Sequence, residues 1–169
     1  MPAPRVLKNF NLFVNGKGKA GTIDEYTPPE IKLKLDEYRG GGLDIPTDLD
    51  MGQEKMTAKF KLSDPDPDTL VLVGLTATNT VRLVAKGAFR RDSDGETISV
   101  VHELVGRING RVSEAWKAGD KTANEFDMTL SYYRETVGGR EIYEIDVENM
   151  IRKVDGVDQL AAIRDAMGM

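Results

Sequence analysis

Apolar and polar side chains alternate with a period of two along most of this 169-residue chain. The pattern is clearest in residues 30–36 and 55–62, whose apolar positions are Ile31, Leu33, Leu35, Met56, Ala58, Phe60 and Leu62. Because successive side chains of a β-strand point to opposite faces, this pattern predicts strands with one buried face and one charged face. We expect the two strands to pair with each other across a long loop at about residues 39–53.

Four further segments alternate in the same way and are predicted to be strands. They cover residues 81–91, 97–108, 124–136 and 141–147. Turn signals mark their ends, at Asp94-Gly95, Asn109-Gly110 and Gly138-Gly139. The chain is therefore predicted to be dominated by antiparallel β-structure.

Two helices are predicted beside these strands. The first follows residues 63–68, where an aspartate N-cap and a proline in the first turn favour initiation, and it is expected to run through Leu75. The second covers residues 157–167, with Asp155 or Asp158 as its N-cap and Gly168 at its end. Its apolar stripe is expected to dock on a sheet, and it consists of Val157, Leu160, Ala161, Ile163 and Met167.

These elements predict one domain, residues 1–169, of mainly β, α+β class. We expect two packed antiparallel sheets, as a sandwich or barrel, with a short internal helix and a C-terminal helix. Sheets of this size leave exposed edges, and exposed edges invite pairing with another chain. Self-association is therefore expected.

The composition excludes several classes of function. With 40% hydrophobic and 30% charged residues the chain is typical of a soluble globular protein. Its net charge of −5 disfavours tight sequence-independent binding to nucleic acid. It has no cysteine and only one histidine, so thiolate catalysis, disulfides and a multi-histidine metal site are excluded. No apolar run is long enough to span a membrane, and the cytoplasm is the expected compartment.

Two glycine-rich motifs could suggest phosphate binding. Residues 16–21 match G-x-G-x-x-G, but Thr27-Pro28-Pro29 and an extended segment follow where a helix would be needed, so a hairpin turn is favoured. Gly40-Gly41-Gly42 has no adjacent lysine, and a corner with positive φ is the better explanation.

Two other sets of polar residues also have a structural explanation. His102 lies on a predicted strand with no identifiable nucleophile and orienting group, so a histidine making one hydrogen bond is favoured. Asp64, Asp66 and Asp68 are separated by prolines and lack the glycine and glutamate of a calcium loop, so helix capping explains them. We expect no catalytic residues, no metal and no cofactor.

Several uncommon strings along the whole chain resemble the major tail tube protein of contractile-tailed bacteriophages and R-type pyocins, the phage tail tube FII-like family. In the first half they are Asn11-Leu12-Phe13, residues 37–44 (EYRGGGLD) and Asp50-Met51-Gly52. In the second half they are residues 131–134 (SYYR), residues 143–146 (YEID), Asn149, residues 156–160 (GVDQL) and Met167-Gly168.

The resemblance implies a structural protein rather than an enzyme. Members of this family form hexameric rings that stack into a hollow tube lined by a continuous β-barrel. The implied partners are the tail sheath, tape-measure, baseplate and tail terminator proteins. The tube belongs to the virion tail or to a tailocin particle assembled in the cytoplasm of the bacterial host, and it serves DNA passage or envelope puncture. The sequence does not distinguish a phage from a prophage or a tailocin.

The resemblance also suggests where subunits meet and which side chains line the channel. The long loop has a binding task if it is ordered, so we expect a subunit interface at Tyr38, Arg39, Gly40, Gly41, Gly42, Asp44, Asp48 and Asp50. The candidate lumen-lining residues are Lys32, Lys34, Thr57, Lys59, Ser99, Glu103, Asp127, Thr129 and Ser131. An acidic lumen would let DNA slide, so the lysines are expected to pair with carboxylates of neighbouring subunits unless another face lines the channel.

Two alternatives remain at this point. One is the tube component of a type VI secretion system, which has the same ring architecture. The other is a monomeric β-barrel that carries a small ligand, which predicts a discrete monomer instead of rings or filaments.

Overall fold

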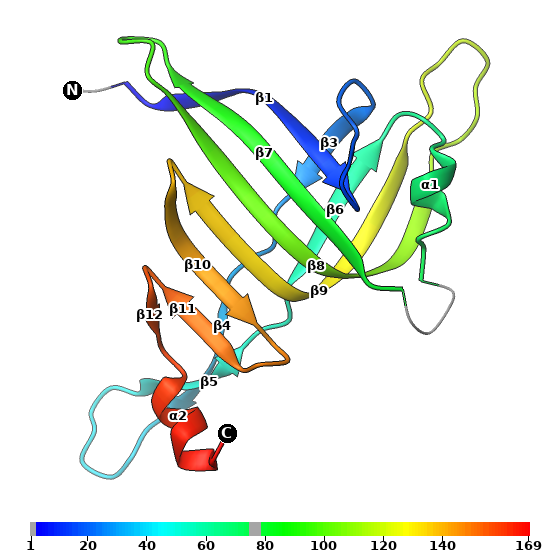
Figure 1. Cartoon of the computed structure of the whole chain (residues 1–169). Helices are drawn as coiled ribbons and strands as arrows, with labels where there is room; N and C mark the ends of the chain where they lie inside the picture. Colours follow the sequence, from blue (N-terminus) through cyan, green and yellow to red (C-terminus); the bar gives the residue numbers. More distant parts are fainter. Residues whose placement is uncertain (1–2, 75–78) are drawn as a thin grey trace.

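The computed structural model describes residues 3–74 and 79–169, and β-strands dominate it (Figure 1). The strands in the first half are β1 (Arg5–Val14), β2 (Lys17–Gly18), β3 (Ile23–Thr27), β4 (Leu33–Tyr38), β5 (Thr47–Gln53) and β6 (Thr57–Leu62). Those in the second half are β7 (Val81–Arg91), β8 (Thr97–Ser113), β9 (Asn124–Val137), β10 (Arg140–Asp146), β11 (Ile151–Val154) and β12 (Val157–Asp158). The helices are α1 (Pro67–Leu70) and α2 (Ala161–Met167), so the mainly β class with two short helices is confirmed.

Ten strands form one antiparallel sheet that forks at β9. Its main path runs β12-β11-β10-β9-β8-β7-β1-β2. The long strand β9 pairs with β8 on one edge, and on its other edge with β6 over residues 124–129 and with β10 over residues 132–137. Strand β3 then pairs with β6, whereas β4 and β5 form a separate two-stranded sheet.

The hydrophobic core lies where the sheet curls back on itself. One buried cluster joins Leu12 of β1 and Leu83 of β7 with Phe60 of β6 and Phe126 of β9. The rings of Phe60 and Phe126 are stacked, with centroids 4.9 Å apart. The two packed layers expected from the sequence are thus two wings of a single branched sheet, and within the described residues no pairing of β3 with β1 or β2 closes it into a barrel.

The predicted pairing of residues 30–36 with residues 55–62 is wrong. Strand β4 pairs with β5, and β6 pairs with β3 and β9. Residues 47–53, which we expected to be part of a loop, form β5, so the loop covers only residues 39–46. The aspartates of this segment disfavour a strand by propensity, but pairing with β4 overrides that weak preference.

Of the three predicted hairpin turns, two are confirmed. Gly95 joins β7 to β8 with φ of 74°, and Gly138 and Gly139 join β9 to β10 with φ of 56° and 83°. Asn109-Gly110 is not a turn, because β8 continues through it to Ser113. A register shift against β9 between Ile108 and Gly110 accommodates the extra residue.

Helix α1 begins as predicted but is shorter. Asp66 is its N-cap, accepting a hydrogen bond from the Thr69 N–H at 3.2 Å, and Pro67 occupies the first turn. The helix ends at Leu70, before Gly74 donates its N–H to the Ile108 carbonyl at 2.7 Å. Leu75, the predicted end, lies outside the described residues.

The start and the packing of the C-terminal helix differ from the prediction. Val157 and Asp158 form β12, and α2 begins at Ala161 without a side-chain N-cap. Asp158 instead accepts the Leu160 N–H at 3.0 Å and an Arg164 N–H at 2.6 Å. Gly168 ends the helix as predicted, with φ of 75°.

The apolar stripe of this segment is not docked on a sheet. The side chains of Val157, Ile163 and Met167 are exposed, and α2 contains no buried residue. Among the described residues, neither helix is long and apolar enough to cross a membrane.

Candidate functional site

The β4–β5 hairpin presents apolar side chains to solvent on both faces. Cross-strand partners share a face, and Leu35 lies opposite Asp50 while Leu49 lies opposite Asp36. Leu35 is 53% exposed and Leu49 is 45% exposed. In the same hairpin Glu37 lies directly opposite Asp48, a pairing of like charges that opposes the stability of the isolated hairpin.

The three glycines shape the tip of this hairpin. Gly42 has φ of 93°, a backbone conformation that residues with a side chain rarely adopt. At Gly40, a Cβ would lie only 3.0 Å from the Tyr38 hydroxyl oxygen. The Arg39 Nε–H donates to the Leu43 carbonyl at 3.1 Å, which closes the tip on itself. The glycines therefore form a compact corner, as expected from the sequence.

The structure brings all eight predicted interface residues together on the hairpin. Tyr38 ends β4, Asp48 and Asp50 lie on β5, and the other five lie in the tip. All are exposed except Gly40, which is half-buried. Asp50 is partly occupied within its own chain, because it accepts the Gly52 N–H at 2.8 Å and pairs with Arg152 of β11 at 3.4 Å.

Seven of the nine predicted lumen residues share the outer face of the main sheet. On β6 and β9, Thr57 lies opposite Thr129 and Lys59 opposite Asp127, with Ser131 two residues further along β9. Ser99 and Glu103 lie on the same face of β8. Lys34 belongs to the separate hairpin and Lys32 precedes it, so these two residues are not part of this face.

Two of the three predicted lumen lysines, Lys32 and Lys59, pair with carboxylates of their own chain. Lys59 lies 3.3 Å from Asp127 and 3.8 Å from Glu125, and Lys32 lies 2.8 Å from Glu30. Lys32 and Lys59 therefore have partners within the subunit, and the pairing of Lys34 with a neighbouring subunit stays a prediction.

Strand β7 makes the outer face more basic than expected. Arg82, Lys86 and Arg90 lie opposite Val105, Val101 and Thr97 of β8, on the side of Ser99 and Glu103. Glu103 is shared between Arg134 at 2.6 Å and Arg82 at 3.7 Å. This part of the face carries more cations than carboxylates.

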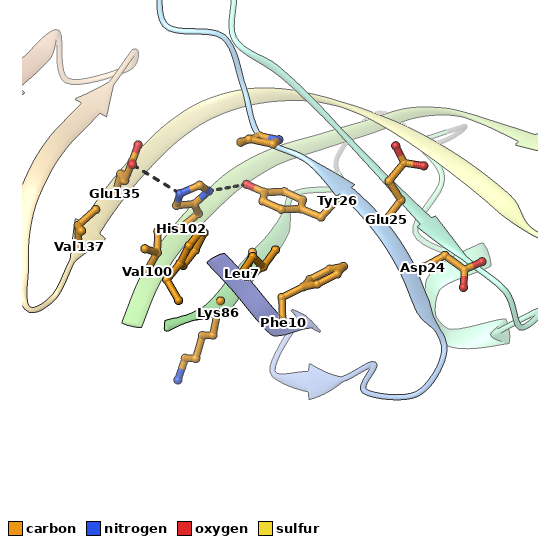
Figure 2. A pocket seen from close by; sticks show the side chains of 14 residues that line it. Leu7, Phe10, Asp24, Glu25, Tyr26, Lys86, Val100, His102, Glu135 and Val137 are labelled. Atoms are coloured by element: carbon orange, nitrogen blue, oxygen red, sulfur yellow. Dashed lines mark hydrogen bonds and ion pairs between the residues drawn. The ribbon is translucent and has the colours of Figure 1, made fainter. Parts of the chain in front are cut away.

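A groove opens between β3 and the sheet formed by β1, β7, β8 and β9. It has a volume of about 470 Å³ and apolar walls that include Leu7, Phe10, Val100 and Val137 (Figure 2). The carboxylate of Glu135 lies at one end and accepts a hydrogen bond from the Tyr133 hydroxyl at 2.9 Å. Sequence reasoning missed this groove, because its walls come from five strands.

His102 lines the groove and makes the one hydrogen bond expected of it. Its Nδ1 lies 3.0 Å from the Tyr26 hydroxyl, and its Nε2 lies 3.7 Å from Glu135. Burial lowers the pKa of His102, although the Glu135 charge opposes this shift. Burial also raises the pKa of Tyr26 and of Tyr133. The cluster is thus neutral at His102 and both tyrosines near pH 7, and none of the three is placed as an activated nucleophile.

Trp116 is a second feature that sequence reasoning missed. It lies in the loop between β8 and β9, and 88% of it is exposed. It is the only tryptophan of the chain, and its neighbours in sequence have small or charged side chains. A single large aromatic residue in such a stretch could have indicated a contact residue.

Comparison with known proteins gives consistent results. Residues 4–168 match the family model described as phage tail tube protein FII. The tail tube protein of Escherichia phage P2 is 34% identical over 172 residues, covering 100% of both chains, and the major tail tube protein of Serratia phage KSP20 is 27% identical, covering 92% of this chain and 91% of the relative. The fold is also shared with a chain of the sheath–tube complex of an extracellular contractile injection system, with a TM-score of 0.60, 12% identity, and coverage of 79% of this chain and 91% of that one.

Proposed function

This chain belongs to the phage tail tube protein FII family and is a tail tube protein of a contractile phage tail, and on this premise we propose that it assembles into hexameric rings that stack into the inner tube of the tail. The role is structural rather than enzymatic. The match along almost the whole chain favours a phage-type tube over the type VI secretion tube and over a monomeric ligand carrier.

The observation that carries this proposal is the β4–β5 hairpin. A two-stranded sheet is marginally stable in water unless it packs against something else. This hairpin leaves Leu35, Leu49 and the tip residue Ile45 exposed, at 53%, 45% and 75%. Burial against another copy of the chain would remove these surfaces from water, so we place a subunit contact at the hairpin, with the eight interface residues named above at its centre.

The tube would lie inside the tail sheath and contact other tail components. The similar fold in a sheath–tube complex supports a position inside a sheath. The baseplate, tape-measure and tail terminator proteins are the other proposed partners. On this proposal the subunit is assembled in the bacterial cytoplasm and is carried in the virion tail or in a tailocin.

We also propose that the outer face of β6, β8 and β9 lines the channel, through the seven residues that share it. The ion pairs of Lys59 neutralise its β6–β9 part, which would limit the number of phosphate contacts made by passing DNA. The exposed cations of β7 would bind the phosphates of passing DNA. A channel that carries DNA therefore requires neighbouring subunits to cover them. A tube that acts by envelope puncture has no such requirement.

Electron microscopy of the purified chain tests the assembly. The wild-type protein should form rings or hollow filaments. Ile45→Ser, and deletion of residues 42–50, should give folded chains that do not polymerise. Val71→Ser is a matched control, because Val71 is 72% exposed and follows α1, outside the hairpin. Normal tubes from both hairpin variants would exclude the hairpin as the contact.

A further inference from the structure

The loop that carries Trp116 extends past the ends of β8 and β9 (Figure 1). Its base is held by two ion pairs, Lys61 with Glu114 at 2.7 Å and Lys121 with Asp24 at 2.9 Å. Residues 115–119 read Ala-Trp-Lys-Ala-Gly, so the indole is flanked by small side chains and by one cation, Lys117. Lys117 has no ion-pair partner among the described residues. The base of this loop is fixed, its indole is exposed and the neighbouring side chains are small, so the loop can insert Trp116 into a cavity.

The groove has the complementary properties. Its walls are apolar, and carboxylates occupy its edges at Glu25 and Glu135, beside Asp24, whose charge is balanced by Lys121 of the same chain. Lys86 is the one lysine among the lining residues, and Figure 2 shows its side chain pointing away from the groove. Its ammonium lies 5.4 Å from the centre of the Phe13 ring instead. The groove therefore presents the carboxylates of Glu25 and Glu135 to an incoming segment.

We propose that Trp116 of one copy inserts into the groove of a neighbouring copy. The indole supplies one N–H donor and no acceptor, and the groove ends at the acceptor Glu135. Lys117 would then approach the carboxylates at the rim. This inference rests on the proposed assembly of the tube and names a second subunit contact within it.

The hairpin tip is a poorer occupant of the same groove. Ile45 is 75% exposed, but Asp44 and Asp48 lie on either side of it. These aspartates would face the carboxylates of the rim. The tip has one cation, Arg39, against two aspartates, so charge favours the loop with Lys117 as the occupant.

The contact can be tested by tryptophan fluorescence and by cysteine cross-linking, because the chain has a single tryptophan and no cysteine. In wild-type tubes, tryptophan emission should shift to the blue and quenching by acrylamide should fall several-fold relative to the monomer. The double variant Leu7→Cys/Ala115→Cys, which keeps Trp116, should give ladders of cross-linked chains when its tubes are treated with a short bismaleimide. Leu7 is suitable because it lines the groove and is 44% exposed.

Ser93→Cys/Ala115→Cys is the matched control, because exposed Ser93 lies in the β7–β8 turn outside the groove. It should give no ladder. Trp116→Ala should leave the monomer folded, since the side chain is 88% exposed, and should raise the critical concentration for assembly at least about tenfold. A folded Trp116→Ala chain that assembles at the wild-type concentration would count against the inference.

The failure of this inference can be distinguished from failure of the tube. If wild-type tubes form while Trp116 stays exposed, or if Trp116 becomes buried but tubes of the Leu7→Cys/Ala115→Cys variant give no ladder, the groove contact is wrong and tube assembly stands. If no rings or filaments form at any concentration or salt, the proposed function fails and the groove contact fails with it.

Discussion

Gly106 lies at the fork of the sheet, and replacing it with alanine should be strongly destabilising. Gly106 pairs with Leu130, next to a register shift of β8 against β9. A Cβ at this position would lie 2.1 Å from the Thr129 carbonyl oxygen and 2.8 Å from the Leu130 Cα. These are backbone atoms, so no side-chain rotation can relieve the clash.

The expected loss of stability follows from how far β8 and β9 must separate to make room for the methyl group. To reach ordinary contact, β8 and β9 must separate by about 1 Å, which takes local N–H···O bonds of about 2.9 Å outside their normal range. Losing about two such bonds costs roughly 1 kcal/mol each, and the overpacking adds about 1–3 kcal/mol. Because Leu130 also donates its N–H to the Met56 carbonyl at 3.0 Å, the β6 branch is strained as well. We expect Gly106→Ala to lower the free energy of unfolding by about 3–5 kcal/mol.

Gly110→Ala is the matched control on the same strand. It also lies at a register shift of β8, but nothing lies within 4 Å of a Cβ there. By reducing the conformational freedom of the unfolded chain it should be neutral or stabilise by up to about 1 kcal/mol. Urea unfolding of the monomers, followed by far-ultraviolet circular dichroism, measures both changes. Equal midpoints for the two variants would refute the close-approach argument.

Two further predictions concern capping and ionisation. Asp66→Ala should lower the free energy of unfolding by about 1–2 kcal/mol, because it removes the N-cap of α1 and the ion pair with Lys19 at 2.5 Å. Asp66→Asn keeps a capping oxygen and should cost less in the same urea assay; an equal loss would assign the effect to the ion pair. Hydrogen bonds from Arg164 and from the Leu160 N–H lower the pKa of Asp158 to about 2. This pKa lies below the unfolded value of about 3.9, so the stabilisation is present above about pH 4 and is lost as the pH falls towards about 2. An NMR titration of the Asp158 carboxyl should give a midpoint near this pKa, and Arg164→Gln should raise the midpoint. An unchanged midpoint in the variant would show that Arg164 does not lower the pKa of Asp158.

Local signals predicted the elements that are determined locally. The Asp66 cap, the Gly95 and Gly138-Gly139 turns and the end of α2 at Gly168 were all predictable, because each depends on a few neighbouring residues. The buried positions in and just before β6 were also predictable, because the alternation of Met56, Ala58, Phe60 and Leu62 places them all on the core side.

Pairing partners were not predictable, because register and neighbours are decided by contacts between distant segments. Asn109-Gly110 has the composition of a turn, yet β9 offers a continuous partner on both sides of it and the chain stays extended. The groove illustrates the same limit, because the first and last of its lining residues in sequence, Leu7 and Val137, are 130 residues apart. The family resemblance, by contrast, depended on local strings and was confirmed by the match over residues 4–168.

The two segments whose packing was predicted wrongly share a physical property. Residues 31–35 alternate and residues 157–167 carry an apolar stripe, and both patterns indicate a buried face. A pattern of this kind shows that a face is buried somewhere, but not that the partner belongs to the same chain. In this subunit Leu33, Leu35, Ile163 and Met167 are all at least 44% exposed. In a chain of the tail tube protein family, we propose that a regular apolar pattern left exposed by the subunit itself forms a contact with another chain of the tube.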